Sequence, residues 1–311
     1  MNLLITGING FIGAYLVSSL KKEYAIYGLD IVYPEKEGII KMYSWDELKF
    51  IQNIDAIIHL AGKAHDIKNK SEEQTYFDIN TNLTKTIFDY FLLSDAKQFF
   101  FFSSVKAVAD SFVGNGLTEE VMPKPVGPYG ESKRAAEDYI NSQFSNFNSQ
   151  LKKVYIFRPC MIHGPGNKGN LTLLYNMVRK GLPWPLGAFE NKRSFLSIDN
   201  LAFIVEAFIK QGPESGIYHL ADDETVSSNE LYKLIALSTG KKERIWNCNK
   251  KMIKLVAQMG DVCRFPLNSD RLKKLTESYI VSNKKMKQAL GISKLPTSAV
   301  EGFEKTLKSF L

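Results

Sequence analysis

Short apolar runs alternate with longer segments of helical periodicity along the first half of the chain. The runs are bounded by glycine or polar residues, which is typical of strands buried on both faces. They lie at 3–6, 25–29, 56–60, 98–102 and 154–157. Segments 11–20, 72–93 and 129–144 carry apolar residues at helical spacing and predict helices. Strands alternating with helices indicate an α/β fold with a doubly wound parallel sheet.

After about residue 160 this alternation gives way to helical segments at irregular spacing. Helices are predicted near 171–180, 200–210, 228–238 and 250–259. We therefore expect a first domain over 1–160, which the chain rejoins at about 195–210, and a smaller, mainly helical, discontinuous domain over 161–311. Segment 105–128 is rich in glycine and proline, and a loop this long inside a compact domain is usually functional.

Composition indicates a folded protein of the cytoplasm. The chain has 311 residues, of which 44% are hydrophobic and 23% charged. No apolar run approaches the roughly 18 residues of a membrane span, and the first residues are too few for a signal-peptide core. The three cysteines, at 160, 248 and 263, match no metal or disulfide pattern, and no metal site is expected.

The net charge of +7 is concentrated in one region. Residues 241–294 contain 14 Lys or Arg against 4 Asp or Glu. Such a region suits an anionic ligand, an anionic membrane surface or nucleic acid, but the chain shows no nucleic-acid-binding motif. The predicted helix 250–259 also carries Met252, Ile253, Leu255 and Val256, so peripheral membrane contact stays open.

A glycine motif follows the first predicted strand directly. Gly7 permits a tight turn, Gly10 lets the backbone approach a pyrophosphate, and Gly13 lets the next helix pack on the strand. The helix amino terminus then presents unpaired N–H groups to phosphate. Asp30 ends the second strand, where an acid binds ribose hydroxyls and repels a 2′-phosphate. The pattern predicts a Rossmann-type dinucleotide site that prefers NAD to NADP.

Tyr129 and Lys133 form the only Tyr-x-x-x-Lys pair in the chain, and they share one face of a predicted helix. A free phenol has a pKa near 10, and a neighbouring ammonium and the nicotinamide ring of NAD would favour its ionised form. Tyr129 could then take a proton from a sugar hydroxyl as hydride leaves the same carbon. Ser104, after the fourth strand, could hold that hydroxyl.

Together these residues resemble the extended branch of the short-chain dehydrogenase/reductase superfamily, the nucleotide-sugar epimerases and dehydratases. The resemblance covers nearly the whole chain. It rests on Thr6-Gly7-x-x-Gly10-x-x-Gly13, Asp30, His59-Leu60-Ala61-Gly62, Asn80, Ser103-Ser104, Tyr129-x-x-x-Lys133, Arg158-Pro159, Gly164-Pro165-Gly166 and Arg193. It implies NAD as cofactor, a nucleotide sugar such as a UDP-sugar as substrate, and a homodimer that pairs through helices 72–93 and 129–144.

The resemblance also implies roles for single residues. Ser104, Tyr129 and Lys133 would be catalytic, with Lys133 anchoring the nicotinamide ribose. The implied cofactor contacts are Gly7, Asn9, Gly10, Phe11, Ile12, Gly13, Asp30, Leu60, Ala61, Gly62, Asn80, Tyr129, Lys133 and Pro159. The implied substrate contacts are Ser104, Lys106, Asn170, Leu171, Arg193 and Arg271, the arginines binding the diphosphate.

One departure from the family narrows the activity. Sugar dehydratases carry an Asp-Glu pair after the catalytic serine or threonine, and Val105-Lys106 stands here. Stretches 103–106, 181–187 and 191–194 resemble a subgroup from bacterial polysaccharide clusters, which includes proteins called 4-epimerases and proteins that reduce 4-keto sugars. The prediction is an NAD-dependent 4-epimerase of a UDP-hexose or UDP-N-acetylhexosamine, acting through a transient 4-keto sugar. The alternatives are an NAD(P)H-dependent reductase of a UDP-4-keto-6-deoxy-hexosamine and, in another class, a non-catalytic nucleotide-binding protein.

Overall fold

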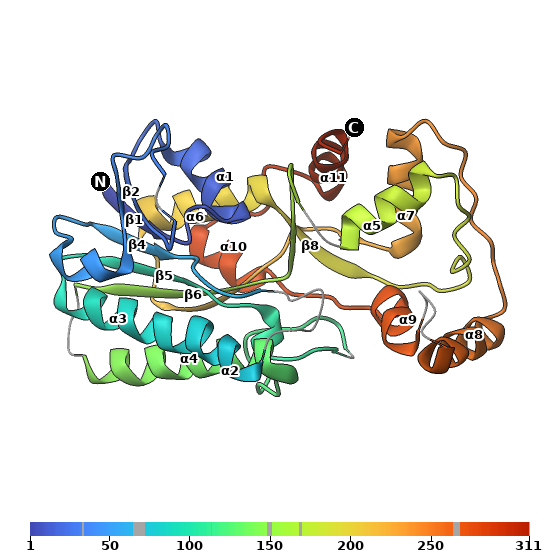
Figure 1. Cartoon of the computed structure of the whole chain (residues 1–311), viewed down its shortest axis with the longest axis horizontal. Helices are drawn as coiled ribbons and strands as arrows, with labels where there is room; N and C mark the ends of the chain where they lie inside the picture. Colours follow the sequence, from blue (N-terminus) through green and yellow to red (C-terminus); the bar gives the residue numbers. More distant parts are fainter. Residues whose placement is uncertain are drawn as a thin grey trace.

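The computed structural model describes residues 1–32, 34–64, 72–112, 114–147, 151–167, 170–263 and 268–310. A seven-stranded parallel sheet forms the centre of its larger part (Figure 1). The strand order is β3-β2-β1-β4-β5-β6-β9, with every neighbouring pair parallel. The strands are β1 (Asn2–Thr6), β2 (Ala25–Leu29), β3 (Lys41–Tyr43), β4 (Ala56–His59), β5 (Gln98–Phe102), β6 (Lys153–Pro159) and β9 (Gly216–Leu220). The order reverses between β1 and β4, where folds of this type bind ligands. The predicted Rossmann-type fold is confirmed.

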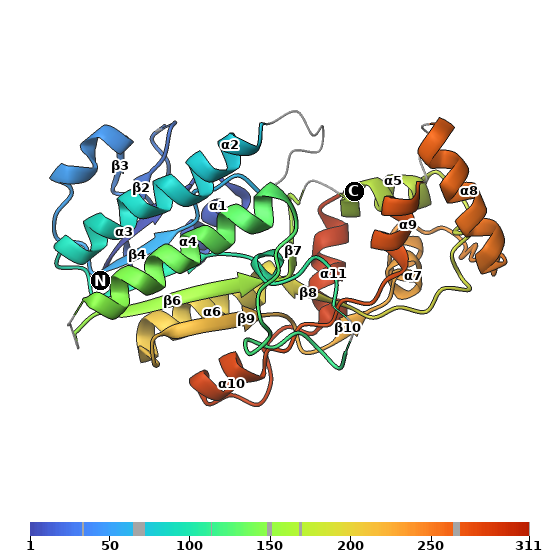
Figure 2. The ribbon, with the colours of Figure 1, turned by 90° about the horizontal axis from the view of Figure 1, so that it is seen from below.

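Helices cover both faces of this sheet (Figure 2). One face carries α1 (Phe11–Leu20), α6 (Ile198–Gln211) and α10 (Lys284–Leu290), and the other carries α3 (Leu83–Leu93) and α4 (Gly127–Asn146). Successive strand residues enter opposite cores: in β5, Phe100 and Phe102 join the first core, whereas Phe99 and Phe101 join the second. This two-sided burial explains the continuous apolar run in the sequence.

The smaller part of the molecule is mainly helical, as predicted, and has its own core. Its helices are α5 (Asn170–Arg179), α7 (Ser228–Ser238), α8 (Lys250–Cys263), α9 (Ser269–Thr276) and α11 (Ala299–Lys308). A small sheet of order β10-β8-β7 joins it, formed by β7 (Met161–His163), β8 (Arg193–Ser197) and β10 (Thr225–Val226). None of the helices in the described ranges combines the length and the apolar character that crossing a bilayer requires.

Several features of the sheet and its helices were not predicted, among them the edge strand β3. The sequence gives no sign of β9, which pairs with β6 and, with α6, brings the chain back to the large sheet. The predicted helix 72–93 is divided into α2 (Glu73–Tyr76), a π-helical segment η2 (Phe77–Asn82) and α3. The predicted loop 105–128 begins with the 3₁₀ turn η3 (Val105–Ala107). Each feature adjoins the residues described next.

Candidate active site

Close backbone contact between the ends of β1 and β4 shapes a glycine-lined crevice. Gly7 has a φ of +66°, in the left-handed region that favours glycine. A Cβ built on Gly7 would lie 2.6 Å from the Ala61 nitrogen, and one on Gly13 would lie 2.7 Å from the Gly7 carbonyl oxygen. The Gly10 N–H donates to that same oxygen at 3.0 Å. Only glycine therefore fits at positions 7 and 13, and the start of α1 is held against the strand ends.

Asp30 and Asn9 lie together at the edge of this crevice. The Asn9 N–H donates to Asp30 Oδ2 at 3.0 Å, and the Ile31 N–H donates to Asp30 Oδ1 at 2.8 Å. Asn9 Nδ2 donates to the Val32 carbonyl at 2.6 Å. Asn9 Oδ1, in contrast, is buried and finds no hydrogen-bond partner among the described residues. An unpartnered buried acceptor is uncommon, and this one suits a bound group that donates hydrogen bonds.

His59 is fully buried at the end of β4 and is neutral. The Ala61 N–H donates to Thr6 Oγ1 at 3.1 Å, so the Thr6 hydroxyl can donate to His59 Nδ1, 2.6 Å away. The Thr84 hydroxyl donates to the Asn80 carbonyl of η2 at 2.7 Å and accepts from His59 Nε2 at 2.9 Å. This network assigns the proton to Nε2. Burial, and then the charge of Lys133, lowers the pKa of His59 to about 3.

We expect this imidazole to make the protein less stable in acid. Unfolded His59 takes up a proton near pH 6.5 and folded His59 only near 3, so the free energy of unfolding falls as the pH drops through that window. His59→Gln should be less stable at neutral pH but lose less stability between pH 6.5 and pH 4. Urea unfolding at several pH values measures both. His219, whose pKa burial lowers to about 4, stays in both proteins, so parallel pH profiles would contradict the assignment to His59.

Asn80 connects the end of β4 to α4 from within the π-helical segment η2. It is fully buried. Its Oδ1 accepts from the Lys63 N–H at 2.8 Å, and its Nδ2 donates to the Lys63 carbonyl at 3.1 Å and to Ser132 Oγ at 3.0 Å. The Thr81 hydroxyl donates to the Ser132 carbonyl at 2.8 Å. π-Helical turns are frequent at functional sites, and this one holds the helix that carries Tyr129 against the crevice.

Lys133 extends from α4 to the ends of two strands. Its Nζ donates to the carbonyl of Phe102, the last residue of β5, at 2.8 Å. A Cβ on Gly62, just after β4, would lie 3.0 Å from the same nitrogen. Burial lowers the pKa of Lys133 to about 8, and the charge of Glu137 opposes this shift. The Lys133 ammonium therefore lies at the carboxyl ends of β4 and β5, where the absence of a side chain at Gly62 leaves room for it.

Tyr129 lies in the first turn of the same helix and is hydrogen-bonded through its side chain to Ser104. Ser104 Oγ also accepts from the Lys106 N–H at 3.2 Å. Tyr76 packs edge-on against the Tyr129 ring, with 6.5 Å between centroids. The sequence predicts that a nearby ammonium lowers the pKa of Tyr129. In the protein itself burial raises this pKa, because it disfavours the phenolate, and the Ser104 hydrogen bond opposes the rise.

A buried ion pair lies one helical turn from Lys133. Glu137 of α4 receives two hydrogen bonds from Arg158 of β6, Nε to Oε1 at 2.8 Å and Nη2 to Oε2 at 2.5 Å. Both side chains are buried, and the Ser103 hydroxyl donates to the same carboxylate at 2.5 Å. The pair thus fixes the residue before Ser104. The four-residue spacing places Lys133 and Glu137 on one helix face, and this could be read from the sequence. Nothing in the sequence, however, indicates that Glu137 pairs with Arg158.

A segment of the smaller part lies against the loop that follows β5. The Tyr279 hydroxyl donates to the Ala109 carbonyl of that loop at 2.8 Å. Tyr279 also pairs with Arg193 at the start of β8, whose Nη1 donates to a backbone carbonyl of α9 at 2.5 Å. Burial lowers the pKa of Arg193. Within the loop, Lys106 forms an ion pair with Asp110. Tyr279 was not predicted from the sequence, and it joins the two parts of the molecule here.

The other predicted site residues are more dispersed. Leu171 of α5 is buried in the core of the smaller part, and the side chain of Asn170 lies outside the described residues. Arg271 lies on α9, where its N–H is capped by Asn268 Oδ1 at 2.8 Å. Pro159 ends β6. Three further predicted cofactor contacts pack against the core of the sheet: Phe11, Ile12 and Leu60.

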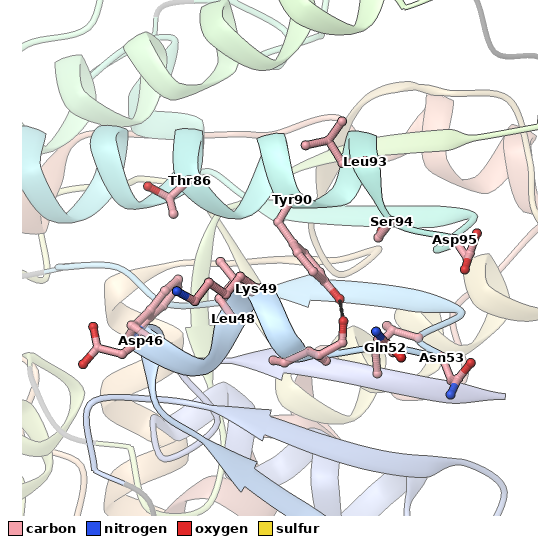
Figure 3. Close-up of a pocket in the computed structure, with 13 residues that line it drawn as sticks. Asp46, Leu48, Lys49, Gln52, Asn53, Thr86, Tyr90, Leu93, Ser94 and Asp95 are labelled. Atoms are coloured by element: carbon pink, nitrogen blue, oxygen red, sulfur yellow. Dashed lines mark hydrogen bonds between the residues drawn. The ribbon is translucent and has the colours of Figure 1, made fainter.

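A pocket of about 920 Å³ opens at the amino ends of the strands, on the opposite side of the sheet from the glycine-lined crevice (Figure 3). It lies between the 3₁₀ turn η1 (Trp45–Phe50) and α3, and the Tyr90 hydroxyl donates to the Ile51 carbonyl there at 2.9 Å. Asn53 and Asp95 of its lining precede β4 and β5, so it adjoins the amino ends of these strands. It contains no predicted site residue and is separate from the candidate active site.

Comparison with known proteins decides the family. The profile of the NAD dependent epimerase/dehydratase family matches residues 3–221. The chain belongs to this family. UDP-glucose 4-epimerase of Vibrio cholerae is 30% identical, over 100% of this chain and 95% of the relative. The N-acetyl-alpha-D-glucosaminyl-diphospho-ditrans,octacis-undecaprenol 4-epimerase of Escherichia coli O157:H7 is 25% identical, over 78% of this chain and 73% of the relative. The crystal structure of UDP-glucuronic acid 4-epimerase from Bacillus cereus in complex with NAD has a TM-score of 0.75 and 19% identity, covering 100% of this chain and 98% of that one.

As a member of the NAD-dependent epimerase/dehydratase family, the chain is an enzyme with NAD as its cofactor, and the predicted family and cofactor are confirmed. The residues present fit this cofactor. Side chains at positions 7 and 13 would fill the turn that a pyrophosphate approaches. The Asp30 carboxylate and the unpartnered Asn9 Oδ1 are acceptors at the edge of the crevice, as ribose hydroxyls require.

Proposed function

We propose that this enzyme is a nucleotide-sugar 4-epimerase, which interconverts UDP-hexoses or UDP-N-acetylhexosamines for bacterial polysaccharide synthesis. One observation carries the proposal: Tyr129, hydrogen-bonded to Ser104, and Lys133 lie at the carboxyl ends of the strands beside the glycine-lined crevice. These are the groups that proton transfer next to a dinucleotide requires. The 4-epimerase names of the Vibrio cholerae and Bacillus cereus proteins support the same reaction.

In the proposed reaction, each of the three side chains has one task. Tyr129 must act as its phenolate, which the positive charges of Lys133 and of bound NAD would favour. Its oxygen then accepts the proton of the C4 hydroxyl, which Ser104 holds, while the hydrogen on C4 leaves with its electron pair. Bound NAD supplies the acceptor for that hydride. Lys133 holds the cofactor ribose and keeps positive charge near the phenolate. The transient 4-keto sugar then turns about its diphosphate link and takes the hydride on its other face, and Tyr129 returns the proton.

This rotation needs a firmly held diphosphate and a loosely held sugar. Arg193 and Arg271 are proposed to bind the diphosphate, because guanidinium groups pair bidentately with phosphate oxygens. Asn170 and Leu171 are proposed to contact the phosphates and uracil, and Lys106 the sugar. The large sheet would then bind the cofactor, and the smaller part would bind the nucleotide sugar.

We further propose a homodimer formed through the outer faces of α3 and α4. The two helices lie side by side on one face of the sheet (Figure 2), where the Tyr139 hydroxyl donates to Asp89 Oδ1 at 2.7 Å. In a two-fold dimer this two-helix surface would pack against the same surface of a second copy of the chain.

Turnover of UDP-sugars by purified protein tests the proposed function. UDP-glucose and UDP-N-acetylglucosamine should each be offered without added cofactor, and the C4 epimers separated by chromatography. We expect an epimer to appear with at least one of the two, because the hydride returns to the substrate and NAD is regenerated in each cycle. The protein should also release NAD on denaturation.

The reductase alternative rests on the resemblance to the polysaccharide-cluster subgroup, which includes both 4-epimerases and 4-keto-sugar reductases, and it needs the same three side chains. It predicts no epimer and the consumption of one reduced cofactor for each 4-keto sugar. That result would overturn the epimerase proposal. An inactive protein that binds UDP-sugar and NAD would favour a non-catalytic role.

A further inference from the structure

Helix α8 presents one apolar face to the protein and a second one to solvent. Ile253 and Ala257 are buried in the core of the smaller part. Four other apolar residues, spaced three or four apart, form what we call the α8 stripe: Met252, Leu255, Val256 and Met259. Their exposed fractions are 66%, 58%, 46% and 53%. The solvent side of a surface helix is normally polar, so a stripe of this kind indicates a contact with a partner.

Basic residues accompany the α8 stripe. Residues 241–261 contain six Lys or Arg and two acidic residues. Lys250, Lys251 and Lys254 of the helix itself are exposed. Trp246, just before the helix, is 56% exposed, and the amphipathic indole ring is enriched at membrane–water interfaces. Lysines on one side of a helix and large apolar side chains on another are typical of helices that lie in the membrane interface.

The position of α8 suits contact with a large partner. In both views the helix lies at the end of the molecule away from the seven-stranded sheet (Figures 1 and 2). The candidate catalytic residues lie instead at the carboxyl ends of β4 and β5. A partner could therefore cover the stripe without displacing the residues proposed to bind NAD.

We propose that the α8 stripe and its lysines dock this enzyme on an anionic membrane surface. Acidic headgroups complement the lysines, and the acyl boundary accepts the four apolar side chains. A second copy of the chain is a poorer partner, because a two-fold contact would oppose two positive patches. Four side chains of one helix also cover much less than the roughly 800 Å² per partner of a stable interface. The inference goes beyond the proposed function and does not depend on it.

Vesicle flotation of the full-length protein tests the docking. We expect the protein to float with vesicles of phosphatidylcholine and phosphatidylglycerol, and to stay at the bottom with phosphatidylcholine alone. Raised salt should weaken binding, since the lysines act through screened charge. The double variant Leu255→Glu, Met259→Glu should reduce the floated fraction by at least about tenfold. Lys251→Gln with Lys254→Gln should reduce it less.

Leu237→Glu is the matched control, because Leu237 is 76% exposed on α7 of the same part and lies outside the stripe. It should float like the unaltered protein. Circular dichroism and NAD content establish that each variant is folded. Absence of flotation by the unaltered protein would overturn the proposal, and so would flotation that the stripe variant leaves unchanged. A stripe variant that instead turns a dimer into a monomer on gel filtration would identify the occupant as a second copy. Epimerase activity of the same samples tests the proposed function separately.

Discussion

Replacing Tyr129 with phenylalanine should lower kcat by about 10²–10⁴-fold, the usual contribution of a positioned acid–base group. The substitution removes only the hydroxyl that is hydrogen-bonded to Ser104 and leaves the ring against Tyr76. NAD content and the unfolding midpoint should change little, because the other implied cofactor contacts, those along the glycine-lined crevice above all, stay in place. UDP-sugar turnover and NAD released on denaturation, measured on one preparation, check the two expectations together.

Tyr76→Phe is the matched control, since it removes the same atom from the neighbouring ring. It should keep most of the activity. If Tyr129→Phe were as active as the unaltered enzyme, the proton would have to move through another group. If activity and bound NAD were lost together, Tyr129 would act in cofactor binding rather than in proton transfer.

Replacing Arg158 with methionine should lower the free energy of unfolding by about 3–5 kcal/mol, the usual cost of breaking a buried ion pair on one side. The Glu137 carboxylate would remain buried without its two hydrogen bonds from Arg158. Its other partners are the Ser103 hydroxyl and Arg134 Nη1, the latter 3.5 Å away, and they replace only part of this interaction. Urea unfolding of the purified variant measures the loss.

A second substitution distinguishes lost charge pairing from lost packing. Adding Glu137→Gln to Arg158→Met removes the unpaired charge, so the double variant should be more stable than the single one. Arg134→Met is the control. Its pair with Asp138 is partly exposed and its contact with Glu137 is long, at 3.5 Å, so its loss should cost at most about 1 kcal/mol. Equal losses for Arg134→Met and Arg158→Met would contradict a special contribution of the buried pair.

The parts of the fold that could be predicted are those with a local signal. Three such signals each span only a few residues: the glycine motif, the phenylalanine run of β5 and the Tyr129–Lys133 spacing. Periodicity and turn chemistry act at that range. The first and last residues of β2, β5 and α1 were therefore predicted correctly.

The features that were missed depend on contacts between distant segments. β9 is a five-residue strand that includes the buried, polar His219, and it becomes a strand by pairing with β6, about 60 residues earlier in the chain. Glu137 and Arg158 would each be expected at the surface, and their burial follows only when α4 packs over the sheet. Local pattern does not contain these partners, so it could not predict them.

The π-helical segment η2 has a consequence for sequence alignment. A π turn closes its hydrogen bonds across one more residue than an α turn. An alignment of this chain with a relative whose helix is regular therefore needs a one-residue gap within 77–82. Without that gap, the residue matched to Asn80 would stand about 100° away around the helix axis. The asparagine that contacts Lys63 should accordingly be identified in relatives by its place beside the end of β4.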